Sequence, residues 1–424
     1  MENCFALKGN IIWSRTPQAL VFAPQHYAVC ENGACAGVFA QLPERFASVR
    51  VEDLGQRLIL PGFVDLHLHA PQYRNAALGY DMELLEWLDA LTFHEEARYG
   101  EEAYARSAYH AFTQALLCTP TTRACVFATA HTQATLLLME MLEQSGLETY
   151  VGRVNMDRNA PPELAEKDAA WALEQTEDWI ERSLARFHRT KPILTPRFAP
   201  SCTPELLAGL GALRKRYQLP VQSHLCETIP EIEWVRSLFP DCADYASVYE
   251  RFGLLSGDTP TIMAHCVYLS DCERQRVKNA GVFIAHCPSS NTNVSSGVAP
   301  VRSFLDDGMR LGLGTDVAGG EALNLLREAS HAVSVSKLRR VLLGGKEGAV
   351  SMDEALYLAT RGGGAFFGSA GAFEPGFVFD AVVFDDERLR PAQELTLRQR
   401  LEKLFYLGDE REVQAKYVGG RRVL

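Results

Sequence analysis

Two histidines separated by one residue stand at the end of an apolar run, Phe63–His69. In a β-strand, residues two apart project from the same face, about 6.6 Å apart along the backbone. His67 and His69 could therefore bind one metal ion together. The pair alone is a weak signal, because a chain with 11 histidines also produces this spacing by chance.

Further groups of the same chemistry follow other apolar runs. His224, His265 and Asp316 each stand at or just after the end of such a run. Neutral imidazoles with one carboxylate are ligands that suit a borderline divalent ion such as zinc. Burying such groups is unfavourable unless they are paired, and a metal ion provides the pairing. The sequence therefore predicts one metal site made of His67, His69, His224, His265 and Asp316.

A second carboxylate lies close to this set. Glu227 follows His224 by three residues, so it cannot share the strand face, and we expect it just past the strand, folded back over the metal. Zinc lowers the pKa of a bound water to about 7, and a carboxylate there can take its proton and deliver it to a substrate. A solvated glutamate at a helix start is the simpler alternative. We group Asp316 and His265 with Glu227 as catalytic, since Asp316 could orient the water or act as base.

Other residues bear on the number of metal ions. Hydrolase barrels with two metals often bridge them by a carbamylated lysine on a strand, and the fourth apolar run, Pro192–Thr195, contains no lysine, although Lys191 precedes it. This favours a single ion. His286 follows another run; we favour a supporting role over ligation for it. The role of His131 stays open.

The apolar runs that contain these residues indicate the fold class. They alternate with stretches of helical period, among them Glu101–Leu117, Pro162–Arg186, Thr203–Tyr217 and Ser270–Ala280. Strands separated by helices indicate an α/β fold, a parallel (β/α)8 TIM-like barrel over residues 61–370, with active-site residues at the carboxyl ends of its strands. A doubly wound open sheet is the alternative, although no GxGxxG follows an early strand. The eight runs are Phe63–His69, Arg123–Ala128, Tyr150–Asn155, Pro192–Thr195, Val221–His224, Thr261–His265, Val282–His286 and Leu311–Gly314.

Both ends of the chain lack helical period and show short strand patterns. We therefore expect residues 1–60 and 371–424 to form one small composite β-sandwich domain. The expected strands are Ala6–Trp13, Ala19–Ala23, Val49–Val51, Arg57–Leu60, Ala381–Phe384 and Lys416–Val418.

Composition narrows the class of protein. The 424 residues are 47% hydrophobic and carry a net charge of −11, so a globular protein is expected and a nucleic-acid partner is not. We see no signal peptide and no apolar run of about 18 residues, which predicts a cytoplasmic protein without a membrane partner. The 11 cysteines are scattered, as expected for reduced core residues.

Several segments together resemble a known family. PGFVDLHLHAPQY, HLCE, MAHC, AHCPSSN and GLGTDVAGG resemble the metal-dependent amidohydrolase superfamily. DMELLEWLDALTFHEE, TTRACVFATAH, KPILTPRFAPSC and LFYLGDER narrow the resemblance to the guanine deaminases, over nearly the whole chain. The first set specifies only the superfamily, whereas HAPQY, LLEWL and TPRF are more specific.

The resemblance implies an enzyme that converts guanine and water to xanthine and ammonia with one zinc ion per chain, usually a cytosolic homodimer. It places the five metal-site residues as ligands and Glu227 as the proton shuttle. It implies that Gln72, Arg197 and Phe198 contact the purine, and we add His224 and Trp87 to these contacts. Arginine carries only hydrogen-bond donors, so Arg197 suits the carbonyl oxygen of guanine. The alternative is that Arg197 forms an internal salt bridge and that the shape of the pocket alone selects the base.

Two other functions stay open. One is a related aminohydrolase or chlorohydrolase acting on a triazine, an oxidised guanine or a methylthioadenosine. The identities of Gln72, Arg197 and Phe198 discriminate, because they should follow the ring being bound. The other is a catalytically idle binding protein on the same barrel, which loss of a ligand or of Glu227 would signal; none is missing here.

Overall fold

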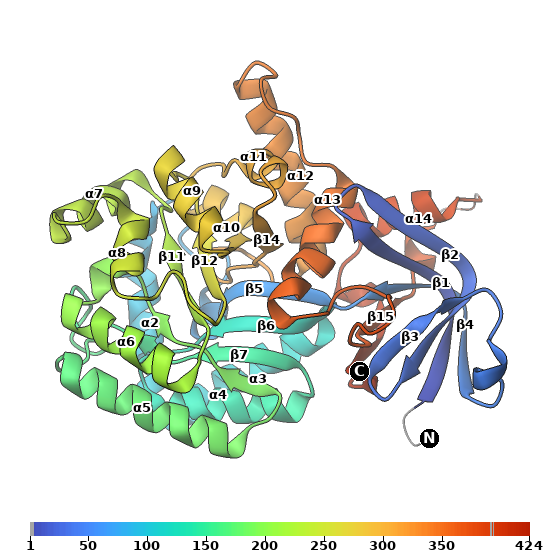
Figure 1. Cartoon of the computed structure of the whole chain (residues 1–424), viewed down its shortest axis with the longest axis horizontal. Helices are drawn as coiled ribbons and strands as arrows, with labels where there is room; N and C mark the ends of the chain where they lie inside the picture. The colour runs from blue at the N-terminus through green and yellow to red at the C-terminus, as the bar shows by residue number, and fades with distance from the viewer. Residues whose placement is uncertain (1–3, 391, 393) are drawn as a thin grey trace.

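The computed structural model describes residues 4–390, 392 and 394–424. It shows a helix-covered parallel sheet beside a second sheet to which both ends of the chain contribute (Figure 1). No helix among these residues is long and apolar enough to cross a membrane.

The larger sheet is parallel and has eight strands in the order β11-β12-β13-β14-β5-β6-β7-β9. Its two outer strands meet, because the main chain of Leu194, just after β9, exchanges hydrogen bonds of 3.0 and 2.9 Å with Pro220 and Gln222 at β11. The sheet is thereby closed into the expected barrel. Its strands are β5 (Phe63–His69), β6 (Thr121–Phe127), β7 (Glu148–Gly152), β9 (Thr190–Pro192), β11 (Val221–Leu225), β12 (Thr261–His265), β13 (Phe283–His286) and β14 (Arg310–Leu313).

Apolar side chains fill the barrel interior. Val64 and Leu66 of β5 pack in one cluster with Ile262 of β12 and Phe283 of β13, although β5 neighbours neither strand. Side chains of non-adjacent strands can meet in this way only across the interior, as in barrels of this type.

The helices cover the outside of the barrel. Those that follow barrel strands include α3 (Glu102–Cys118), α4 (Thr132–Ser145), α5 (Ala169–Arg186), α6 (Pro204–Tyr217), α7 (Ile229–Leu238), α8 (Tyr245–Arg251), α9 (Asp271–Asn279), α10 (Pro288–Asn293), α11 (Val301–Asp306), α12 (Leu325–Leu342) and α13 (Met352–Tyr357). The short α1 (Leu84–Trp87) and α2 (Phe93–Ala97) follow β5, and α14 (Leu397–Leu407) precedes the last strands.

All eight predicted runs overlap barrel strands, although Pro192–Thr195 shares only Pro192 with β9 and otherwise continues it. The run predicted over Tyr150–Asn155 is split at Arg153 into β7 and β8 (Val154–Asn155), and β8 pairs with β10 (Thr195–Pro196) in a separate two-stranded sheet. The helix predicted from Pro162 begins only at Ala169, because the side chain of Asp168 accepts a hydrogen bond from the Trp171 amide and caps the helix.

The strands from the two ends form one mixed sheet in the order β17-β16-β15-β4-β1-β2-β3. Asn32 and Gly33, between β2 and β3, both have positive φ and form a tight Asn-Gly hairpin turn. The strand that follows this turn, β3, was not predicted from the sequence. The separate strands expected at Val49–Val51 and Arg57–Leu60 are one strand, β4, with a register shift against β1. The strands are β1 (Cys4–Thr16), β2 (Ala19–Glu31), β3 (Ala34–Phe39), β4 (Arg50–Pro61), β15 (Ala381–Phe384), β16 (Val413–Val418) and β17 (Arg421–Arg422).

This terminal sheet curls around its own core. Phe5 of β1 and Tyr417 of β16 have ring centroids 5.6 Å apart although two strands lie between them in the sheet. Neighbouring strands are about 4.8 Å apart, so a flat sheet would keep these rings much further from each other. The expected sandwich is therefore a single hydrogen-bonded sheet that folds back on itself.

Buried charges join the terminal sheet to the start of β6. Asp380, just before β15, pairs with Arg123 of β6 at 2.6 Å and accepts a hydrogen bond from the Gly419 amide. The ammonium of Lys416 on β16 is fully buried and donates to the carbonyl oxygens of Leu116 and Thr121. These contacts lie at the end of the barrel opposite the carboxyl ends of its strands.

Candidate active site

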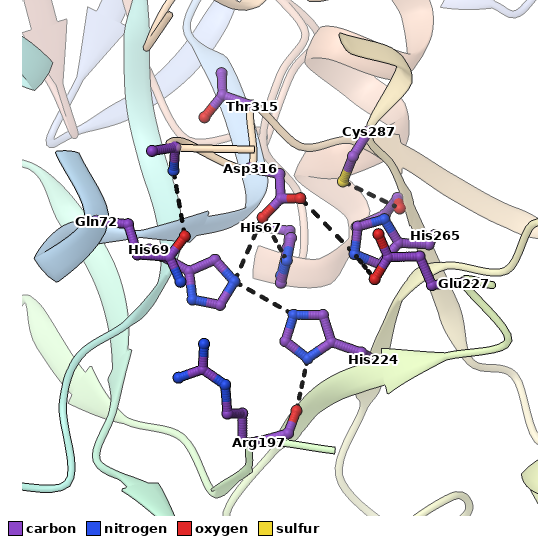
Figure 2. A network of polar contacts seen from close by, with 12 residues as sticks. His67, His69, Gln72, Arg197, His224, Glu227, His265, Cys287, Thr315 and Asp316 are labelled. Carbon is purple, nitrogen blue, oxygen red and sulfur yellow. Dashed lines mark hydrogen bonds and ion pairs between the residues drawn. The ribbon is translucent and has the colours of Figure 1, made fainter. Parts of the chain in front are cut away.

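The five predicted metal ligands come together at the carboxyl ends of the barrel strands. His67 and His69 lie at the end of β5, His224 near the end of β11, and His265 at the end of β12. Asp316 follows β14 by three residues, and Figure 2 shows its carboxylate among the imidazoles. Four of the five are buried, and His224 is partly buried.

An irregularity in β5 and a buried carboxylate position the first histidine pair. The register of β5 against β6 shifts between Asp65 and Leu68. The carboxylate of Asp65 accepts hydrogen bonds from the amides of His67 at 3.2 Å and Thr315 at 3.1 Å, and from the Thr315 hydroxyl at 2.6 Å. Asp65 therefore ties the strand with the histidines to the residue preceding Asp316.

Two of the predicted ligands and one neighbouring residue occupy left-handed backbone conformations. The φ angles are 71° at His265, 51° at Cys266 and 47° at Asp316. Such conformations are unfavourable for residues other than glycine and persist only where the surroundings impose them. Hydrogen bonds do so here, from the Asp316 amide to the His67 carbonyl at 2.8 Å and from the Cys266 amide to the Leu225 carbonyl at 3.0 Å.

The donor atoms of the set converge. Asp316 Oδ1 lies 3.0 Å from His67 Nε2 and 3.3 Å from His69 Nε2. His69 Nε2 and His224 Nε2 face each other at 3.3 Å, and His265 Nε2 lies 3.8 Å from Asp316 Oδ2. One ligand atom each from His67, His224 and His265 fall within 4.8 Å of one another.

Neighbouring acceptors fix which nitrogen of two rings is free to bind a metal. His224 donates from Nδ1 to the Arg197 carbonyl at 2.6 Å, and His265 from Nδ1 to Asn291 Oδ1 at 2.8 Å. Each Nε2 then points into the site without a proton if the ring is neutral. Burial favours the neutral form of these rings. It lowers the pKa of His67, and it lowers the pKa values of His69 and His224 well below the usual value for histidine.

This donor set fits a metal ion. His224 Nε2, which carries no proton in the neutral ring, lies 3.3 Å from His69 Nε2, and a cation between them would attract both nitrogens. Neither ring nitrogen of His67 forms a hydrogen bond within the described part of the chain, although both are buried. Burial disfavours a charge on Asp316, but the imidazoles, His67 foremost, lower the pKa of its carboxyl so that it stays ionised. Imidazoles with one carboxylate form a metal site, and they suit zinc.

Glu227 lies where the sequence analysis expects it, two residues beyond β11 and beside the ligands. Its Oε2 is 3.4 Å from His265 Nε2, and its Oε1 accepts a hydrogen bond from the Ser296 hydroxyl at 2.8 Å. Its backbone is held by Glu231, whose Oε2 accepts from the Glu227 amide at 2.9 Å. Burial raises the pKa of Glu227 to about 7. A carboxyl with this pKa can both accept and donate a proton near neutral pH.

A pocket opens over this set. Gln72, Trp87, Arg197 and Phe198 all line it, together with His69, His224, His265, Glu227 and Asp316. The Trp87 indole is anchored by its Nε1, which donates to the Leu78 carbonyl at 2.8 Å. Phe198 packs edge-on against Trp234 of α7, with ring centroids 5.9 Å apart. Every residue predicted to contact a purine thus lies on one pocket.

Arg197 also takes part in an internal salt bridge. Its Nη1 pairs with Oε2 of Glu96, and the other oxygen of Glu96 accepts a hydrogen bond from Gln72 Nε2 at 2.8 Å. Arg197 and Glu96 are 3% and 1% exposed, so this is a buried pair. The alternative that Arg197 is held by an internal partner is therefore realised, while its side chain still lines the pocket.

His286 and His131 lie outside the predicted ligand set. His286, at the end of β13, is buried, and its Nδ1 has no hydrogen-bond partner among the described residues. Burial lowers its pKa to about 3, which keeps it neutral. His131 directly precedes α4, and burial lowers its pKa.

The sequence did not reveal four residues whose hydrogen bonds position the side chains of the candidate site. Glu96, Asn291 and Ser296 form hydrogen bonds to Gln72, His265 and Glu227 from other segments of the chain, and Asp65 binds His67 within β5. Asp65 offered one signal, a carboxylate between apolar residues at the start of a strand, where burial needs several partners. The other three are polar residues in polar segments, and only the folded chain shows their partners.

Comparison with known proteins agrees with this geometry. Residues 58–423 match the Amidohydrolase family. The guanine deaminase of Dictyostelium discoideum is 38% identical over 381 residues, which cover 88% of this chain and 84% of that protein. The guanine deaminase of Escherichia coli K12 is 36% identical over 395 residues, covering 90% of this chain and 86% of that protein.

The fold of a solved relative is closely similar as well. The crystal structure of guanine deaminase from C. acetobutylicum with bound guanine in the active site superposes with a TM-score of 0.97 at 41% identity, covering 100% of both chains. The likeness thus extends over the barrel and the terminal sheet alike. By sequence and by structure, the chain belongs to the amidohydrolase family and, within it, to the guanine deaminases.

Proposed function

We propose that the chain converts guanine and water to xanthine and ammonia with one zinc ion per chain and with Glu227 as the proton carrier. The observation that carries this proposal is the convergence of the buried donor atoms beneath a pocket that also holds Glu227 and Arg197. The residues that would hold the ion are His67, His69, His224, His265 and Asp316.

A zinc ion held there supplies a water nucleophile of lowered pKa, which is the chemistry that attack on a purine carbon needs. Asp316, besides holding the ion, would orient the attacking water or accept its proton. Asn291 and the Arg197 carbonyl keep the ligand nitrogens of His265 and His224 turned toward the ion.

Glu227 would make two proton transfers. As a carboxylate it takes a proton from the nucleophile, and as a carboxylic acid it protonates the ring nitrogen of guanine, which makes the adjacent carbon electrophilic. A second transfer moves the remaining hydroxyl proton of the attacked carbon to the amine, which leaves as ammonia as the new carbonyl forms. The pKa of about 7 that burial gives Glu227 suits both directions. Ser296 occupies one of its oxygens, which leaves the other for the proton.

The purine would lie between the aromatic and polar walls of the pocket. Trp87 and Phe198 offer apolar ring surfaces. Arg197 offers donors to the carbonyl oxygen of guanine, and Gln72 offers both a donor and an acceptor. His224 would contact the purine beside the ion.

The decisive experiment measures ammonia release from guanine, adenine, cytosine and a triazine, with zinc content determined on the same sample. We expect guanine to be deaminated fastest, with about one zinc per chain. Faster release from another ring would support a related aminohydrolase and overturn the assignment of guanine. Full activity without any metal would overturn the zinc site.

We also propose that the chain forms a homodimer. Leu338, Val341 and Leu342 near the end of α12 are 53%, 75% and 74% exposed, an apolar surface that a second copy could cover. Light scattering of the purified protein tests this: a mass of twice 47.0 kDa is expected, and a monomer at micromolar concentration would contradict it.

A further inference from the structure

One buried carboxylate contacts both polar residues proposed to bind the purine. Glu96 lies on α2 and is 1% exposed. Its Oε1 accepts from Gln72 Nε2 at 2.8 Å, and its Oε2 pairs with Arg197 Nη1. Glu96 lies behind them, outside the set of described residues that line the pocket.

We propose that Glu96 positions Gln72 and Arg197 for the purine carbonyl edge and thereby sets the substrate preference of the site. The inference rests on the proposed function, in which those two side chains bind guanine. Glu96 does not touch the substrate; it acts through the two residues it holds.

For Gln72, the contact fixes the orientation of the amide. A carboxylate accepts only, so the end of the amide that faces Glu96 must be the nitrogen. The Gln72 oxygen then faces the Ala318 amide, which lies 3.4 Å away. Without the negative charge of Glu96, only the long contact with the Ala318 amide would favour this orientation, and a flipped amide would exchange the donor and acceptor offered to the purine.

For Arg197, the contact supplies a counter-charge and a fixed direction. The guanidinium lies over the ring of Phe93, with its central carbon 4.9 Å from the ring centre. Phe93 and Glu96 belong to the same short helix, so α2 holds both the face and one edge of the guanidinium. A guanidinium has five N–H donors, and those not used by Glu96 are available to a ligand in the pocket. A buried cation left unpaired would shift toward water or recruit another anion.

The chain offers a matched control on the same helix. Glu95 is also buried, at 7% exposure, but its carboxylate pairs with Arg98 at 3.2 Å and with the Tyr104 hydroxyl. Neither partner lines the pocket in the described residues. Glu95→Gln therefore removes a buried charge from α2 without touching Gln72 or Arg197.

The test compares Glu96→Gln with Glu95→Gln in the zinc-loaded protein. For Glu96→Gln we expect a rise in KM for guanine of about 10-fold to 100-fold, the size of a lost charge-assisted contact, with kcat within a few-fold and zinc content unchanged. Inhibition by 2-aminopurine, which lacks the carbonyl oxygen, should weaken less than guanine binding does. Glu95→Gln should leave both values unchanged. An unchanged KM in Glu96→Gln, or an equal loss for both purines, overturns the proposal.

A double-mutant cycle separates positioning from a general effect on folding. If Glu96 acts through Arg197, Glu96→Gln should add little to the KM of Arg197→Ala. Additive effects, or loss of zinc from Glu96→Gln, would show that it acts elsewhere. Should Glu96→Gln fold poorly, Glu96→Asp keeps the charge and shortens its reach, and an intermediate KM is expected. Failure of the proposed function itself shows separately, as absent guanine deamination by the unmodified protein.

Discussion

His224 donates a hydrogen bond from Nδ1 to the main-chain carbonyl of Arg197 at 2.6 Å, while the Arg197 side chain lines the pocket above it. One residue therefore contributes its backbone to the metal site and its side chain to the pocket. The two contributions can be separated by mutation, because the carbonyl is present whatever side chain stands at this position.

Arg197→Ala is expected to keep zinc and lose base preference. The carbonyl that orients His224 remains, whereas the donors proposed for the guanine carbonyl are removed. Sites built for such hydrogen bonds can discriminate against an analogue by about 10⁴-fold, so the ratio of kcat/KM for guanine over adenine should fall steeply. Steady-state kinetics on both purines, with zinc analysis, measures this. Guanine turnover with an unaltered preference would mean that pocket shape selects the base.

Glu227→Gln is expected to keep the metal and lose about 10²–10⁴-fold in kcat, because the amide cannot carry the proton. Glu233→Gln, on the exposed side of the adjacent helix α7, serves as the matched control and should behave like the unmodified protein. If Glu227→Gln loses zinc stoichiometrically, the residue is a ligand. If it turns over guanine at the original rate, the shuttle lies elsewhere.

Removal of the metal should abolish activity reversibly. We expect elemental analysis to give about one zinc per active chain, and dialysis against a chelator to give inactive protein that regains activity with zinc. His67→Ala should fail to regain it, because the variant lacks one of the buried nitrogens that converge at the site. Two metals per active chain would contradict the single site.

Asn291→Ala removes the acceptor that turns His265 toward the site. Losing such a partner typically weakens metal binding by about 10-fold to 100-fold. Competition with a chromophoric zinc chelator would measure the change. Thr292→Ala, one residue further on α10, is the control, since its hydroxyl donates to the Pro288 carbonyl and not to His265. Equal zinc affinity in Asn291→Ala and the unmodified protein would show that the ring is held without this contact.

Lys416→Met should stabilise the fold below about pH 7. Burial lowers the pKa of Lys416 from 10.5 to about 7. Between these values the unfolded chain binds more protons than the folded one, so this group makes stability rise with pH across that window. Below pH 7 the buried charge of Lys416 lowers the free energy of unfolding by at most about 5 kcal/mol. The hydrogen bonds to the carbonyl oxygens of Leu116 and Thr121 offset part of this loss.

Thermal unfolding of both proteins at pH 6 and pH 10 tests this prediction. The variant should have the higher Tm at pH 6, and its advantage should shrink or reverse at pH 10. Comparing the two proteins at each pH cancels the titration of all other groups. A difference in Tm that does not change with pH would show that Lys416 does not titrate in this window.

Most of the barrel could be predicted from the sequence, because buried parallel strands form apolar runs whose ends can be read directly. The predicted ligand set followed, since His69, His224 and His265 each end one of the predicted runs and His67 lies two residues before His69. Glu96 could not be found in this way, because its partners Gln72 and Arg197 come from other segments and meet only in the closed barrel. The β3 strand was missed because its small residues lack alternation, although Asn32-Gly33 marks its hairpin. The division into domains at residues 60 and 370 stays a prediction.

The order of strands in the terminal sheet has a consequence for synthesis of the protein. β4 lies between β1 and β15, so β1 and β4, which are made before the barrel, pair in one sheet with β15, which is made after it. During synthesis, one edge of β4 and the apolar face around Phe5 stay exposed until residues of β15 and β16 leave the ribosome. We therefore expect the nascent chain to need protection from aggregation until β15 and β16 have been made, and a stop codon between the barrel and β15 to leave all the proposed active-site residues in a chain that does not accumulate.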